Sequence, residues 1–144
     1  MTAHCLPLVF LFVAGSITAL VLASGCLDEG PGPDDRIIQT IPPAEASALI
    51  EEMEGVPDFV IIDVRRPGEF AGGHIPGAIN IDSALFSDHL NDLDPDGTYL
   101  IYCQRGVRSA GVREMMREAG FREVYEIEGG MSAWQAAGLP VVTD

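Results

Sequence analysis

One stretch of this chain decides its fold: Thr98-Tyr-Leu-Ile-Tyr-Cys-Gln-Arg-Gly-Val-Arg-Ser109. Its apolar first half predicts a buried strand that ends at Tyr102, and the pattern after it predicts a helix over residues 107–119. A single thiol, Cys103, lies between the end of the strand and the start of the helix. The positive end of a helix and nearby guanidinium groups both favour a thiolate. Cys103 is therefore a candidate nucleophile, and the alternative is a buried structural thiol.

The segment after Cys103 has the composition of an anion-binding loop. Successive backbone N–H groups in a tight turn can point inward at an anion, and Gly106 permits the positive φ that such a turn needs. Arg105 and Arg108 add charge and paired donors for an oxyanion. We therefore predict a substrate-binding and persulfide-binding loop made of Gln104, Arg105, Gly106, Val107 and Arg108.

Strands and helices alternate through the rest of the domain, which indicates an α/β fold with a mainly parallel sheet. Strands are predicted near residues 37–41, 59–62, 78–81, 99–102 and 123–126, with helices between them. Ser83 is a candidate helix cap, and Arg113 and Arg117 are expected on a solvated helix face. Ligands of such sheets bind beyond the carboxyl ends of the strands, where Asp63 and Cys103 both lie.

Charge and cysteine usage exclude several classes of function. The net charge is −14 and every basic residue is arginine, so binding of nucleic acid through bulk charge is not expected. The three cysteines, Cys5, Cys26 and Cys103, and the three histidines show no spacing typical of metal ligands. We therefore expect neither a metal nor another cofactor.

The N-terminal part has the pattern of a targeting segment followed by a linker. Residues 6–23 are almost wholly apolar, and Ala23-Ser24-Gly25-Cys26 resembles the lipobox of prokaryotic lipoproteins. Either Cys26 is lipidated after cleavage, or the apolar segment stays as a transmembrane anchor. Both outcomes predict a domain held at the extracytoplasmic face of the cell membrane. We expect a signal or anchor over 1–26, a flexible acidic Gly/Pro linker over 27–35, and a folded domain over 36–144.

Five blocks in order resemble the rhodanese family of sulfurtransferases over about residues 36–142. They are Ile61-Ile-Asp-Val-Arg65, Glu69-Phe70, Gly73-His-Ile-Pro-Gly-Ala-Ile-Asn-Ile81, Tyr102-Cys-Gln-Arg-Gly-Val-Arg-Ser109, and Gly129-Gly-Met-Ser-Ala-Trp134 with Gly138-Leu-Pro140. The resemblance implies a rhodanese-like fold, in which a central parallel sheet is flanked by helices on both faces.

The resemblance also implies a reaction. Cys103 would take a sulfur atom from a small anionic donor such as thiosulfate and hold it as a persulfide. Cyanide, a small thiol or a sulfur-accepting protein would then remove it. Asp63, Arg65 and His74 match family positions and are expected to brace the loop, and Trp134 is expected in the core.

Three other functions remain open at this stage. One is a persulfide carrier or interaction module without efficient turnover, and another is a purely structural envelope domain. The third is a phosphatase or arsenate reductase, but the phosphatase relatives of the fold have a loop one residue longer. Here four residues separate Cys103 from Arg108, which suits sulfur better than a phosphoryl group.

Overall fold

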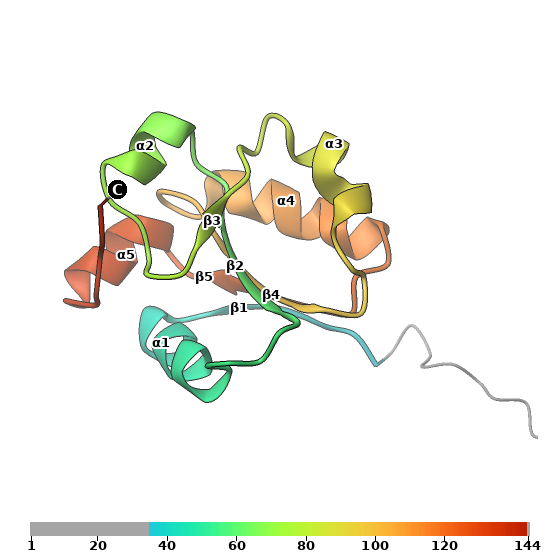
Figure 1. The fold of residues 1–144 in the computed structure, drawn as a ribbon, viewed down its shortest axis with the longest axis horizontal. Helices are drawn as coiled ribbons and strands as arrows, with labels where there is room; N and C mark the ends of the chain where they lie inside the picture. Colours follow the sequence, from blue (N-terminus) through green and yellow to red (C-terminus); the bar gives the residue numbers. More distant parts are fainter. Residues whose placement is uncertain (1–34, 144) are drawn as a thin grey trace, which may run out of the picture. The chain divides into compact units, whose positions relative to one another are not determined.

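A computed structural model of the chain describes residues 35–143, which form an α/β domain (Figure 1). The predicted signal or anchor, its Cys26 lipidation site and nearly all of the predicted linker lie outside the described residues and stay predictions. The elements in chain order are β1 (Ile37–Ile41), α1 (Pro43–Glu52), β2 (Phe59–Asp63), α2 (Pro67–Ala71), β3 (Ile79–Asn80), α3 (Phe86–His89), the 3-10 helix η1 (Leu90–Asp92), β4 (Thr98–Tyr102), α4 (Val107–Glu118), β5 (Glu123–Ile127) and α5 (Gly130–Ala136).

The five strands form one parallel sheet in the order β1-β5-β4-β2-β3. The predicted fold class is therefore confirmed. β4 lies at the centre of the sheet and all five of its residues are buried, as the continuous apolar run of a parallel strand covered on both faces requires. Cys103 directly follows β4, so it lies in the middle of the row formed by the carboxyl ends of the strands.

Side chains on β4 alternate between two hydrophobic cores, because successive strand residues point to opposite faces of a sheet. Tyr99, Ile101 and Cys103 pack with residues of α3 and α4, whereas Leu100 and Tyr102 pack with residues of α1 and α5. Figure 1 shows α1 on one side of the sheet and α3 and α4 on the other. Cys103 therefore faces the N-terminal end of α4. Trp134, 2% exposed, lies in the second core as expected.

One local expectation differs from the structure. Ser83 does not cap a helix: α3 begins at Phe86 with Leu85 at the cap position, and the Ser83 backbone N–H donates to the Val64 carbonyl instead. This bond joins the segment after β3 to the residue that follows β2, so Ser83 lies before the start of α3. Within residues 35–143, no helix has both the length and the apolar character needed to cross a lipid bilayer.

Candidate active site

Cys103 lies at the entrance to α4 with its sulfur enclosed by the following loop. Its side chain is buried, with 1% exposure. The Gly106 backbone N–H donates to the Cys103 Sγ at 3.1 Å. Gly106 has a φ of 91° and caps the N-terminus of α4, a left-handed conformation that favours glycine. The loop thus turns back on the thiol and aims backbone dipoles at it.

These contacts decide the charge state of the thiol. Burial raises the pKa of Cys103, and hydrogen bonds to its sulfur lower it, among them those from the backbone N–H groups of Arg105 and Gly106. The net effect is a pKa below the usual value for cysteine. The thiolate is the nucleophilic form of cysteine, so the site favours the reactive state.

The loop backbone is fastened to the start of α5. The backbone N–H groups of Met131 and Ser132 donate to the carbonyls of Cys103 and Gln104, at 2.8 and 3.0 Å. The Gln104 side chain also donates to the Ser132 Oγ at 3.0 Å. Gly130 permits this close approach, because a Cβ at that position would lie 2.2 Å from the Cys103 carbonyl oxygen.

A buried ion pair between Asp63 and Arg65 supports the loop from the end of β2. The Arg65 Nη2 donates to the Asp63 Oδ2 at 2.7 Å, and the two side chains are 5% and 0% exposed. A second Nη2 contact reaches the Gly73 carbonyl at 2.6 Å, and Nη1 donates to the Gln104 Oε1 at 3.0 Å. Arg65 therefore connects Asp63, the segment before β3 and the loop.

His74 also belongs to the group of side chains that support the loop. Its ring stacks on Phe70 with 3.8 Å between centroids, and its Nδ1 donates to the Phe70 carbonyl at 3.0 Å. The His74 backbone exchanges two hydrogen bonds with Val142 near the C-terminus. His74 is 5% exposed and holds neighbouring segments together.

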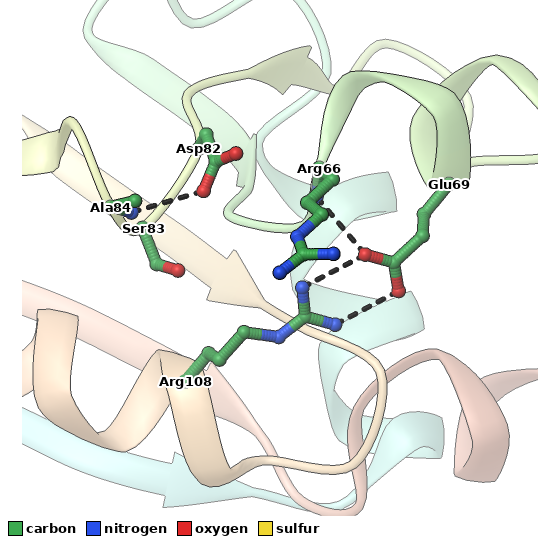
Figure 2. Close-up of a pocket in the computed structure, with 6 residues that line it drawn as sticks. All are labelled: Arg66, Glu69, Asp82, Ser83, Ala84 and Arg108. Carbon is green, nitrogen blue, oxygen red and sulfur yellow. Dashed lines mark hydrogen bonds and ion pairs between the residues drawn. The ribbon is translucent and has the colours of Figure 1, made fainter.

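The two loop arginines have different surroundings. Arg108 donates through both terminal nitrogens to the Glu69 carboxylate, at 2.8 and 2.9 Å. Arg105 is exposed, and no partner of its side chain is found within residues 35–143. The Arg108–Glu69 pair lines a pocket of about 450 Å³. Figure 2 shows how the two side chains face each other there. The pocket is lined by Arg66, Glu69, Asp82, Ser83, Ala84 and Arg108.

The Arg108–Glu69 pair predicts a pH effect on stability. The hydrogen bond from Arg108 lowers the pKa of Glu69 from 4.5 to about 2. The pair therefore stabilises the folded state fully at a pH above the unfolded-state pKa of Glu69. This stabilisation is lost as the pH falls through the lower, folded-state pKa of Glu69. Both side chains are about a third exposed, so we expect about 1 kcal/mol or less.

Urea unfolding of the wild type and Glu69→Gln measures this effect. The difference in unfolding free energy should be constant from pH 7 to 5 and shrink between pH 4 and 2. A difference that grows on acidification would contradict the assigned pair.

Sequence patterns missed Ser109 and Glu126 as parts of the site, although both lie next to Cys103 in space. The Ser109 Oγ lies 3.4 Å from the Cys103 Sγ and donates to the Glu126 Oε1 at 2.6 Å. Glu126 is 3% exposed, and the only signal in the sequence was a charged residue at the end of a predicted strand. The expectation for Arg113 was wrong, because it pairs with Glu126 at 2.9 Å instead of lying on a purely solvated face. Arg117 pairs with Glu114 on the exposed face as expected.

Comparison with known proteins agrees with this geometry. The family model described as rhodanese-like domain matches residues 43–137. A thiosulfate sulfurtransferase GlpE of Pseudomonas putida is 35% identical over 96 residues, which cover 67% of this chain and 84% of that protein.

Solved structures give the same picture. A rhodanese-related protein of Thermoplasma volcanium superimposes with a TM-score of 0.63 at 29% identity, covering 74% of this chain and 99% of that one. A protein of unknown function from Rhodopseudomonas palustris, described as a possible tyrosine phosphatase, has a TM-score of 0.63 at 32% identity. That match covers 73% of this chain and 85% of the other.

Proposed function

Because the chain belongs to the rhodanese-like domain family, we propose that it transfers sulfane sulfur through a persulfide on Cys103. The donor is a small anion such as thiosulfate, and the acceptor is cyanide or a thiol. The observation that carries the proposal is the loop around Cys103, whose backbone N–H groups surround a buried sulfur of lowered pKa. Relatives named as thiosulfate sulfurtransferases support the choice of donor.

The first half-reaction forms the persulfide. The Cys103 thiolate attacks the outer sulfur of thiosulfate, the sulfur–sulfur bond of the donor breaks, and sulfite leaves with the electron pair. Arg105 is exposed on the loop, and its positive charge draws an anionic donor to this edge despite a net charge of −14 on the whole chain. Arg108, at the end of the loop, is paired with Glu69.

The second half-reaction returns the thiolate. The carbon atom of cyanide, or the sulfur of a thiolate acceptor, attacks the outer sulfur of the persulfide. The bond between the two sulfurs breaks and its electron pair returns to the Cys103 Sγ. The same N–H groups that favour the thiolate favour it as a leaving group, because they are already aligned when its charge develops.

The test is to incubate the full chain with thiosulfate and measure its intact mass. We expect a gain of one sulfur atom located on Cys103 by peptide analysis, then its loss with release of thiocyanate when cyanide is added. Cys103→Ser is the control and should show neither signal.

Each other result has a defined meaning. No adduct on the folded wild type would overturn the proposal. An adduct that cyanide and thiols do not remove would favour a persulfide carrier. Hydrolysis of an aryl phosphate that depends on Cys103, with no sulfur adduct, would favour a phosphatase.

A further inference from the structure

A buried hydroxyl and a buried carboxylate lie in line behind the Cys103 sulfur. Ser109 is 0% exposed and Glu126 is 3% exposed. The Ser109 Oγ is 2.6 Å from the Glu126 Oε1 and 3.4 Å from the Cys103 Sγ. The other carboxylate oxygen, Oε2, faces Arg113 at 2.9 Å and Thr40 at 3.3 Å. Oε1 is therefore left for Ser109.

Hydrogen counting sets a limit on what Ser109 can do. A serine hydroxyl has one proton to donate and two lone pairs to accept with. A contact of 2.6 Å to a carboxylate oxygen is a short charge-assisted hydrogen bond. The longer contact to sulfur cannot use the same proton at the same time. Ser109 therefore offers a lone pair to Cys103 while its proton lies on the Glu126 side.

We infer that Glu126 is a positioning residue that holds the Ser109 proton away from Cys103, so that Ser109 accepts from the thiol and does not stabilise the thiolate. In the thiol form, the S–H group of Cys103 donates to the Ser109 Oγ. In the thiolate form, the sulfur relies on backbone donors such as Gly106.

The meaning of this arrangement for catalysis rests on the proposed function. A thiolate loses nucleophilicity as its pKa falls. Hydrogen bonds from several donors at once would produce an abundant but weak nucleophile. By holding the Ser109 proton, Glu126 keeps the Cys103 sulfur more reactive than it would be if Ser109 donated to it as well as the backbone N–H groups.

Most of the charged groups around the site lie in ion pairs. Cations and carboxylates lie in pairs on the neighbouring elements: Arg65 with Asp63 at the end of β2, Arg108 with Glu69 of α2, and Arg113 with Glu126. Asp82 and Arg66 line the pocket next to Arg108, Arg105 is exposed, and α5 carries no charged residue. Only Glu126 connects to the sulfur through a hydrogen-bonding side chain within residues 35–143.

The decisive variant is Ser109→Ala, and the measurement needs no sulfur donor. The rate of Cys103 alkylation by iodoacetamide is followed against pH in the full chain. Peptide mass spectrometry isolates Cys103 from Cys5 and Cys26. We expect the Cys103 pKa to stay the same or fall. A rise of about one unit or more, as expected when a hydrogen bond donated to a thiolate is lost, would overturn the inference.

A double-mutant cycle adds a test that a purely structural role would not pass. Glu126→Gln should lower the Cys103 pKa, because it removes a negative charge and releases the Ser109 proton. The lowering should be smaller in the Ser109→Ala background. Equal lowering in both backgrounds would mean that Glu126 acts by charge alone, contrary to the inference.

Thr40→Val is the matched control, because it removes a contact to Oε2 and leaves the Oε1–Ser109 bond in place; the Cys103 pKa should not change. Circular dichroism checks that each variant is folded. If Glu126→Gln does not fold, the direction of the Cys103 pKa change in Ser109→Ala is sufficient to test the inference. Alkylation shifts as expected, combined with no persulfide from thiosulfate, would reject the proposed function and retain the role of Glu126.

Discussion

Gly130→Ala should abolish most of the sulfur-accepting activity and destabilise the domain by about 2–6 kcal/mol. The φ of 58° at Gly130 is strained for any residue with a Cβ. The new methyl group would also lie 2.2 Å from the Cys103 carbonyl oxygen and 2.9 Å from the Gln104 carbonyl carbon. Both contacts are with backbone, which cannot rotate away. Relief requires α5 and the loop to separate, and that breaks the bonds from Met131 and Ser132 to the loop.

Gly111→Ala is the matched control. Gly111 lies inside α4, where a Cβ would have no neighbour within 4 Å. Alanine is favoured over glycine in a helix interior, so a gain of about 0.5–1 kcal/mol is expected. Urea unfolding measures both variants, and intact mass after thiosulfate treatment measures adduct formation. A Gly130→Ala protein with wild-type stability and adduct would refute the packing described for α5.

Asp63→Asn should cost about 3–5 kcal/mol, the usual result of removing one partner from a buried ion pair. Asp63 accepts four hydrogen bonds from Arg65, one from its backbone and three from its guanidinium group. Asparagine would direct an N–H group at one of these donors and leave the Arg65 charge buried without a counterion. Since Arg65 also holds Gln104, persulfide formation should fall even under conditions where the variant is folded.

The control for this prediction is Glu114→Gln. Glu114 pairs with Arg117 on the exposed face of α4, with side chains about half exposed. Exposed pairs of this kind contribute little to stability, so the urea midpoint should not change measurably. Equal shifts for Asp63→Asn and Glu114→Gln would show that the Asp63–Arg65 pair is not the buried support that its contacts indicate.

The sheet and its reactive loop could be predicted because they follow from local patterns. Apolar runs such as Phe59–Ile62 and Tyr99–Tyr102 allow little except strands buried on both faces, and both became adjacent strands of the sheet. The glycine at 106 marks the turn that places α4 behind Cys103. These features depend on neighbours in the sequence, so the sequence alone was sufficient for them.

Contacts between charged residues of different elements could not be predicted in this way. Arg113 has glutamate neighbours on its own helix, which favoured a solvated face, yet its partner is Glu126 on β5. Glu126 could not be assigned to the site, because nothing near it in the sequence shows that Ser109 lies next to it in the folded domain. Helical spacing shows which residues share a face but does not show what packs against that face.

The sheet order also sets the time at which the site is completed. β1 pairs only with β5 among the described strands, with Ile37 opposite Glu123. The first strand to leave the ribosome must therefore wait for the last, and such distant pairing makes folding slow. Glu126 is carried by that last strand, so the carboxylate behind Cys103 arrives in the final stage of synthesis. Until then no carboxylate is available to hold the Ser109 proton, so the surroundings of Cys103 are complete only in the finished domain.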